Sequence, residues 1–398
     1  MNTAPTTTPS NIPLSEPEIS GNEWKYVKEC LDTGWVSSAG SFVHRFENEF
    51  AAFANAEHAI AVANGTVGIH LALKLVGVQA DDEVLVSNMT FIAPVNAISY
   101  CGAYPVLVDT SPVDWQIDPE KIARFLRVEC EIKNGECFNR KSGRRVRAIL
   151  PVHTLGLACR MDLICDLARE FKLKVVEDAA EGVGVRYQGQ HIGTFGDVGI
   201  FSFNGNKIIT AGSGGIVVTN NARYAENARY LTTQAKDDSV EYIHNEIGYN
   251  YRLTNIQAAI GVAQLERIGE FVERKRAIAR KYAAAFADIR FLSLMPVSAD
   301  VEPTFWLYTV LLNPKITLEQ RKFVLKALND NGIGARPFWH PIHGLPPYRS
   351  CRSVEIEHSV SLYTRGISLP CSVGLNDEDL DRCIRVFLQI IGEDALLR

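Results

Sequence analysis

Hydrophobic and polar positions follow a helical period at the start of the chain. Four phenylalanines recur every three or four positions, and this spacing predicts an amphipathic helix with an apolar face of Phe42, Phe46, Phe50 and Phe53. Upstream, Ser20 and Glu23 have the spacing of a capping box. We therefore expect an earlier helix to begin there and to run to about Asp32.

From about residue 58 the pattern changes to short β-rich runs that alternate with helical stretches. Most of these runs are continuously apolar, as strands covered on both faces are. The pattern predicts an α/β domain built on a mostly parallel mixed sheet. The expected strands are 59–63, 83–87, 104–109, 147–152, 173–177, 198–203 and 215–219.

Residues 126–147 interrupt this alternation. Asn134-Gly135 lies between two polar-alternating runs, which is the signature of a β-hairpin with a tight turn. We predict that the segment is a hairpin inserted on the surface of the large domain.

The pattern changes once more after Asn255. A long helical pattern continues to about Phe286, and we expect a strand at 306–312 and helices at 317–331 and 376–392. This arrangement predicts a smaller α+β domain over residues 256–398. The large domain would then cover residues 12–255, after a disordered lead at 1–11.

The composition excludes some classes of protein but does not identify a function. A chain of 398 residues can build two cores, and its net charge of -5 offers no general attraction to nucleic acid or to an anionic membrane. No signal peptide and no membrane-length apolar run is present, so we expect a cytoplasmic protein. The nine cysteines are scattered, which suits reduced thiols, and we expect no metal site.

Four separated segments suggest one site. Asn64-Gly65-Thr66 follows an expected strand and opens a helix, where backbone N–H groups can bind an anion. Asp178 ends another strand, at the sheet edge where ligands of open α/β folds bind.

The other two segments lie further along the chain. Lys207 stands between an apolar strand and a glycine-rich turn, with Ser202 close before it. Desolvation at such a place favours the neutral amine that Schiff-base chemistry requires. Residues 248–258, which include Asn250, crowd polar groups into a loop before a helix. A turn with an N-cap does not explain that density.

Together these segments resemble the DegT/DnrJ/StrS family of sugar aminotransferases, from Ile12 to about the final helix. The resemblance implies fold type I, with a large domain that binds pyridoxal 5'-phosphate (PLP). The opening residues and the segment 126–147 also resemble a subgroup that acts on UDP-linked 4-keto-6-deoxy-N-acetylhexosamines.

The resemblance implies roles around the cofactor ring. Lys207 would hold PLP as a Schiff base and move the proton, and Asp178 would pair with the pyridine nitrogen. Phe91 would stack on the ring and Ala180 would pack on its opposite face. Glu181 stands where the family often has glutamine, near the 3-hydroxyl of the cofactor, so its role is open.

The resemblance also implies contacts to the phosphate and the substrate. Gly65, Thr66 and Ser202 would bind the phosphate from one subunit and Asn250 from its partner, in a homodimer with shared sites. Further positions resemble sugar-contacting or nearby positions of the family, and each could equally be structural: Trp35, Ser37, Ser38, His153, Arg336, Trp339, His340 and His343.

The implied reaction is a ping-pong transfer of an amino group from an amino acid, with L-glutamate as the expected donor, to a keto-sugar nucleotide. Three alternatives stay open. A PLP-dependent sugar dehydratase of this fold would have histidine in place of Lys207. A Rossmann-type dehydrogenase or epimerase needs a G-x-G-x-x-G turn, which the segment after Asn64 does not supply. A non-enzymatic PLP-binding regulator would bring a DNA-reading module, for which neither end has room or charge.

Overall fold

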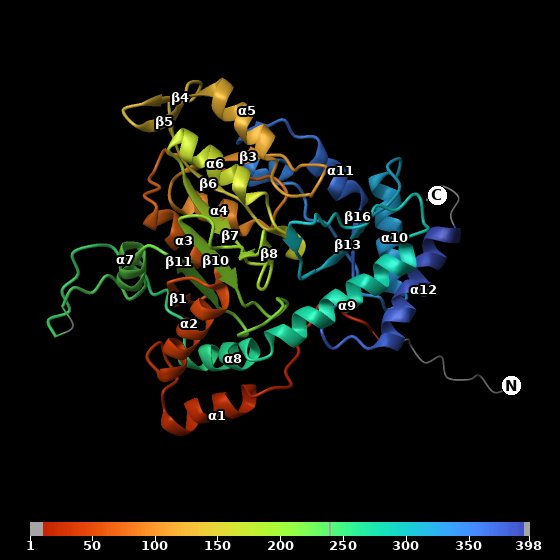
Figure 1. The fold of residues 1–398 in the computed structure, drawn as a ribbon, viewed down its shortest axis with the longest axis horizontal. Coiled ribbons are helices and arrows are strands. Elements are labelled where there is room, and N and C mark those ends of the chain that lie inside the picture. Colours follow the sequence, from red (N-terminus) through yellow and green to blue (C-terminus); the bar gives the residue numbers. More distant parts are fainter. Residues whose placement is uncertain (1–10, 239, 394–398) are drawn as a thin grey trace.

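A central sheet surrounded by helices forms the larger part of the molecule (Figure 1). The computed structural model describes residues 11–238 and 240–393, so residues 1–10 of the expected lead lie outside the described residues. The main strand order is β1 (His58–Val62), β11 (Gly215–Thr219), β10 (Val198–Ser202), β7 (Lys174–Asp178), β6 (Arg145–Leu150), β2 (Glu83–Ser87), β3 (Tyr104–Val108) and β15 (Arg352–Val354).

The pairing of these strands confirms the predicted mixed sheet. Strand β11 runs antiparallel to β1 and β10, whereas the pairs from β10 to β15 are parallel. Helices cover both faces, as continuous apolar strands require. Leu85 of β2 points into one apolar core, and its neighbours Val84 and Val86 point into the other.

Helix α2 fixes the position of strand β10, which leads to the candidate lysine. Phe46 and Phe50 of α2 are fully buried. Their rings pack edge-on against Phe203 and Phe201, with centroids 5.0 Å apart in both pairs. Burial of each ring stabilises the fold by about 1.5–3 kcal/mol. The helices around the sheet are α2 (Ser41–Ala54), α3 (Gly65–Leu75), α4 (Ala93–Tyr100), α5 (Pro119–Glu129), α6 (Met161–Phe171) and α7 (Ala222–Thr232).

The first helix lacks the predicted capping box. Helix α1 (Glu23–Thr33) begins at Glu23 itself, and Asn22 at its N-cap makes no side-chain cap hydrogen bond. The Glu23 carboxylate accepts instead from the N–H of Gly21 at 2.8 Å. Ser20 is bound by Arg267, 247 residues away, so a tertiary contact replaces the local one.

The segment 126–147 contains the predicted hairpin but is not a separate surface insertion. Strands β4 (Cys130–Lys133) and β5 (Glu136–Asn139) join through Asn134 and Gly135, with φ of 53° and 81° as a type I′ turn requires. Strand β5 continues by pairing with β6 of the central sheet. Backbone hydrogen bonds along the edge of β6 therefore make the hairpin part of the sheet.

The predicted long helix after Asn255 is two helices, α8 (Asn255–Leu265) and α9 (Ile268–Phe286). Helix α8 packs on α1 and α2, on the large domain. The N-terminal helices therefore cover the apolar face of α8, and the expected domain boundary at residue 256 stays a prediction.

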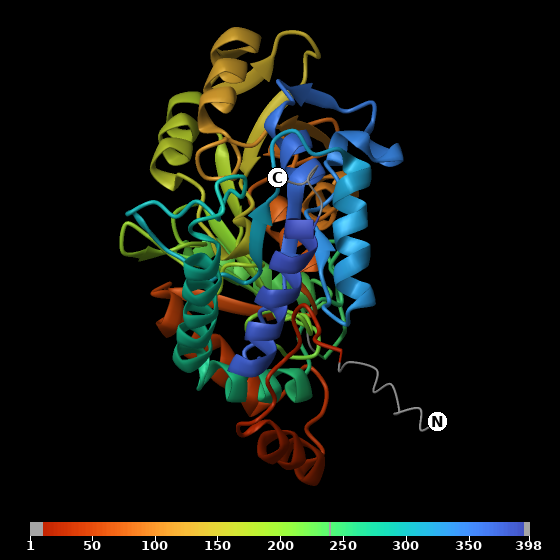
Figure 2. The same cartoon turned by 90° about the vertical axis from the view of Figure 1, so that its right-hand side faces the viewer.

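The small domain follows the predicted α+β order. Its sheet has the order β13 (Tyr308–Leu311), β16 (Gly366–Leu369) and β14 (Arg336–Pro337). Helix α12 (Asp377–Glu393) lies between α9 and α10 (Leu318–Asp330), as Figure 2 shows. The remaining short elements are β8 (Arg186–Tyr187), β9 (Gln190–His191), β12 (Val301–Glu302), α11 (His358–Arg365) and the 3₁₀ turns η1 (Thr154–Gly156), η2 (Ile342–Gly344) and η3 (Pro346–Tyr348).

Residues 11–238 and 240–393 contain neither a membrane-spanning helix nor a cluster of metal-binding side chains. No helix there is both long enough and apolar enough to cross a bilayer. Within the same ranges, no group of three or more His, Cys, Asp or Glu side chains is placed to bind a metal ion.

Candidate functional site

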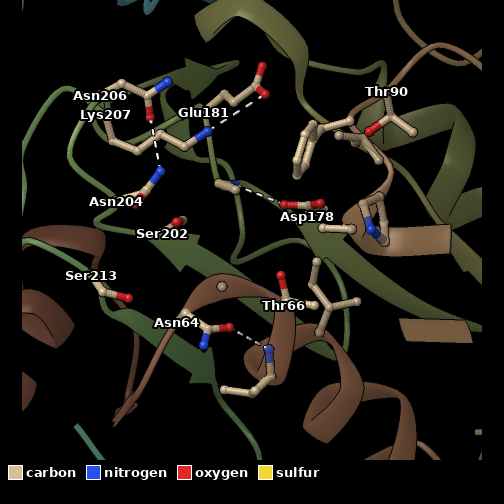
Figure 3. Close-up of a pocket in the computed structure, with 18 of the residues that line it drawn as sticks. Asn64, Thr66, Thr90, Asp178, Glu181, Ser202, Asn204, Asn206, Lys207 and Ser213 are labelled. Carbon is tan, nitrogen blue, oxygen red and sulfur yellow. Dashed lines mark hydrogen bonds and ion pairs between the residues drawn. The ribbon is translucent and has the colours of Figure 1, made fainter. Parts of the chain in front are cut away.

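A cavity of about 650 Å³ opens at the carboxyl ends of β7 and β10, beside the first turn of α3 (Figure 3). Parallel strands deliver their last residues to one edge of the sheet. Asp178 ends β7, Ser202 ends β10, and Lys207 follows β10 in a short loop. The small domain closes the cavity with Trp306 and Trp339.

The first turn of α3 and the end of β10 form an anion cradle. The Asn64 Oδ1 caps the helix by accepting from the N–H of Val67 at 3.0 Å. A Cβ on Gly65 would lie 3.0 Å from the Cβ of Ser202, so only glycine lets the backbone come this close without a shift. Thr66 and Ser202 line the same corner. Backbone N–H groups and two hydroxyls suit a phosphate.

Asp178 is a buried carboxylate with fixed orientation. Its Oδ1 accepts from the N–H of Ala180 at 3.0 Å, and its own N–H donates to the carbonyl of Pro151 at 2.9 Å. Burial raises the pKa of Asp178, against the effects of the Ala180 N–H and of Lys207. A cationic ring N–H in the cavity would offset the cost of keeping this carboxylate charged.

The amine of Lys207 lies between an acid and an aromatic face. Its Nζ is 3.7 Å from the Oε1 of Glu181 and 4.0 Å from the ring centroid of Trp306. The indole N–H of Trp306 donates to the carbonyl of Asn206 at 2.7 Å, which holds the loop that carries Lys207. The lysine side chain retains 13% of its exposure.

Glu181 is held from the other side by an unusual turn. Its Oε2 accepts from the N–H of Leu155 at 2.9 Å, and Leu155 has a left-handed φ of 62°. Burial raises the pKa of Glu181 to about 7, while Lys207 and the Leu155 N–H oppose that rise. The acid is therefore close to half-protonated near neutral pH.

The structure brings most of the predicted cofactor residues together. Phe91 is 57% exposed at the mouth of the cavity. Asn250 is exposed and is not among the lining residues. The predicted residues that line the cavity are Gly65, Thr66, Phe91, Asp178, Ala180, Glu181, Ser202 and Lys207.

The model of the DegT/DnrJ/EryC1/StrS aminotransferase family matches residues 17–387. The chain belongs to this family. It is 40% identical over 381 residues to a GDP-perosamine synthase of Caulobacter vibrioides, covering 96% of this chain and 98% of that protein. A GDP-perosamine synthase of Escherichia coli O157:H7 is 40% identical, over 93% and 95% of the two chains.

Solved structures agree with this assignment. A family member from Brucella abortus superposes with a TM-score of 0.84 at 27% identity, over 92% of this chain and 95% of that one. Aminotransferases of this family use PLP, and the anion cradle, the buried carboxylate and the enclosed lysine described above fit that cofactor. The protein is a PLP-dependent aminotransferase.

The expected substrate contact of His153 is not supported by its position in this aminotransferase. The ring is completely buried. Its Nδ1 accepts from the N–H of Cys159 at 3.1 Å, so Nε2 carries the proton, 3.1 Å from Glu177. Both ring nitrogens are occupied, and His153 is not among the residues that line the cavity. These two contacts tie the segment from His153 to Cys159 to Glu177.

The remaining predicted substrate residues differ in their position relative to the cavity. Trp339 lines it, with its ring stacked 6.1 Å from Trp306. Arg336 is exposed and bonds to the carbonyl of Ala335. The His340 ring packs on Tyr363, and the His343 N–H donates to Asn88. That Arg336, His340 and His343 contact the substrate stays a prediction.

The predicted residues of the loop between α1 and α2 also lie outside the cavity of their own chain. Trp35, Ser37 and Ser38 are exposed between α1 and α2, and the backbone carbonyls of Trp35 and Ser37 accept from Asn255 at 2.8 and 2.7 Å. None of the three is among the residues that line the cavity of its own chain. Their predicted contact with the sugar stays a prediction.

Trp306 was missed because its surroundings carry no functional signal in the sequence. An aromatic residue at the start of a strand normally packs in a core. Its position over Lys207 depends on contacts across 99 residues of chain. Further lining residues, to which no individual cofactor or substrate contact was assigned from the sequence, are Asn64, Asn204, Asn206, Ser213, Tyr100 and Trp306.

We expect Gly65→Ala to weaken PLP binding at least about tenfold, because the added methyl enters the gap between the turn of α3 and Ser202. Titration of cofactor-free protein with PLP measures the affinity. Gly269→Ala is the matched control, since a Cβ on Gly269 meets no atom within 4 Å. Equal affinity for PLP in Gly65→Ala and native protein would contradict the cradle.

Proposed function

We propose that this aminotransferase moves an amino group from L-glutamate to the keto group of a sugar nucleotide. The observation that carries the proposal is the convergence of three groups on one cavity: the amine of Lys207, the carboxylate of Asp178 and the first turn of α3. Each group is common by itself. Together they suit a cofactor that carries a phosphate, an aldehyde and a ring nitrogen that an acid keeps protonated.

Each of these groups has a distinct task in the proposal. Lys207 bonds to the cofactor and later holds or moves the proton at the reacting carbon. Asp178 would pair with the pyridine nitrogen and keep it protonated, and the cradle of Gly65, Thr66 and Ser202 would bind the phosphate. The bound cofactor supplies an electron sink for the carbanion. Trp306 and Trp339 exclude water from one wall of the cavity.

The nucleotide of the acceptor is proposed from the relatives. The UDP-linked N-acetylhexosamines were expected from a resemblance of the opening segment and of residues 126–147. Two relatives that are 40% identical over almost the whole chain are named GDP-perosamine synthase. We therefore favour a GDP-linked keto sugar as the acceptor and a UDP-linked one as the competing substrate.

A homodimer with shared sites is proposed from the arm formed by residues 233–238 and 240–250, which extends from α7 away from the body of the molecule (Figure 1). The arm exposes Val240, Tyr242, Ile243 and Ile247, and Ile247 is 86% exposed. Apolar side chains gathered on a projecting arm favour coverage by another chain. Asn250 stands exposed at the base of the arm, and we infer that it reaches the phosphate of the partner subunit.

We expect borohydride reduction of the PLP-loaded protein to attach the cofactor to Lys207, as read by peptide mass mapping. Lys207→Ala and Lys207→Arg should lose the label and all turnover, because neither side chain offers a nucleophilic amine. Lys322→Ala, a change of an exposed lysine on α10, should keep both. A label on any other lysine of the native protein rejects the proposed function.

We expect GDP-linked 4-keto sugars to be aminated faster than UDP-linked ones when the enzyme, PLP and L-glutamate are incubated with a panel of both. Mass spectrometry identifies a product in which C=O has become CH–NH₂. A higher kcat/KM for the UDP-linked sugars would reverse our choice of nucleotide, and water loss without amination would indicate a dehydratase.

We expect a mixture of Lys207→Ala and Asn250→Ala chains to recover up to about a quarter of native activity at limiting PLP, although each variant alone is impaired. In a mixed dimer one site receives both native residues and the other receives neither. Activity after unfolding and refolding the chains together measures this. Mixtures no more active than the average of the separate variants argue against a shared site.

A further inference from the structure

Glu181 and Lys207 face each other inside the cavity, and the reaction proposed above leaves this acid without a task. The closest approach is 3.7 Å, between Lys207 Nζ and Glu181 Oε1 (Figure 3). Trp306 covers the other side of the amine at 4.0 Å. The Glu181 side chain retains only 5% of its exposure, so bulk water has little access to the pair.

Lys207 must be a neutral amine to attack an aldehyde, because an ammonium ion has no free electron pair. The proton that it sheds needs an acceptor in this enclosed place. We propose that Glu181 is that acceptor. An N–H bond of the Lys207 ammonium breaks, its electron pair stays on nitrogen, and an O–H bond forms at Glu181 Oε1. The inference rests on Lys207 being the residue that bonds to PLP.

The groups that face Glu181 support this role. Asp178, three residues earlier, acts together with burial to raise the pKa of Glu181, whereas Lys207 and the Leu155 N–H lower it. The resulting pKa of about 7 lets the acid accept a proton and return it near neutral pH. His153 neighbours Asp178, and the N–H at its Nε2 is directed at Glu177 rather than at Glu181 or Lys207.

The turn at 154–156 aims the carboxylate. Leu155 adopts a left-handed conformation, which costs about 1 kcal/mol for a residue with a side chain. In this conformation its N–H binds Glu181 Oε2 at 2.9 Å and leaves Oε1 for Lys207. Gly156 follows with a φ of 78°, and a Cβ there would lie 2.4 Å from the backbone nitrogen of Trp306. One strained turn therefore holds both neighbours of the amine.

Glu181→Gln tests the proposal with little disturbance, because the amide oxygen can still accept from Leu155 while the proton acceptor is lost. The measurement is the rate at which cofactor-free protein captures PLP, followed by absorbance across neutral pH. In the native protein this rate should rise as pH increases through about 7, where Glu181 loses its proton. In Glu181→Gln that inflection should vanish, and capture at neutral pH should slow at least about tenfold.

A rate of PLP capture in Glu181→Gln that equals or exceeds the native rate overturns the proposal. If Glu181 only pairs with the ammonium, removing its charge frees the amine, and Glu181→Gln captures PLP as fast as the native protein or faster. Glu181→Asp keeps a carboxylate on a shorter side chain and should retain the inflection with a slower rate. Glu83→Gln is the matched control: Glu83 is buried and bound to Asn139, away from this cavity, and its loss should leave the capture profile unchanged.

Borohydride mapping separates this inference from the proposed function. If Lys207 carries the label in the native protein and in Glu181→Gln, the lysine assignment holds whatever the capture profile shows. A Lys207 label with an unchanged profile in Glu181→Gln rejects the role of Glu181 alone. Absence of a Lys207 label in the native protein rejects both.

Discussion

The close approach of one amine and one acid in a secluded cavity is the feature that the surrounding fold makes possible. Lys207 Nζ lies 3.7 Å from the Oε1 of Glu181 and 4.0 Å from the ring centroid of Trp306. In bulk water two such groups would be screened from each other, and the nearby acid would contribute little. Inside the cavity the same two groups can exchange a proton.

The parallel strands bring these groups to one place. Strands β7 and β10 are adjacent and parallel, so Asp178 and Ser202 reach the same edge of the sheet from segments 24 residues apart. Helix α2 holds β10 through its buried phenylalanines. Strand β11 runs antiparallel to β10, so the loop between them, which carries Lys207, lies at the same edge of the sheet. The apolar cores therefore determine where the polar groups meet.

The small domain contributes the walls of the cavity. Trp306 is tied to the lysine loop through Asn206, and its carbonyl accepts from the buried amine of Lys275 at 2.9 Å. Strand β15, from the C-terminal part of the chain, pairs with β3 of the large sheet, and Asn88 bonds to His343 and Ser359. These links hold the two domains in the arrangement that encloses the amine.

The groups that local sequence patterns reveal could be identified before the fold was described. Apolar strands, a helix that opens at Asn64-Gly65-Thr66, and the lysine before a glycine-rich turn are all recognisable, because strand ends and helix starts depend on neighbouring residues. The mostly parallel sheet and the order of the small domain followed from the same periodicity. The family resemblance added PLP, with Lys207 expected to hold it and Asp178 expected to pair with its pyridine nitrogen.

The surroundings of those groups depend on the packing of distant segments. Packing placed Trp306 over Lys207, directed Leu155 at Glu181, buried His153 against Glu177 and laid α8 on the N-terminal helices. Each of these outcomes depends on contacts between segments far apart in the chain, where packing and burial override local preference. Burial also decides the protonation of Glu181, because the desolvation that raises its pKa exists only once the cavity has closed around it.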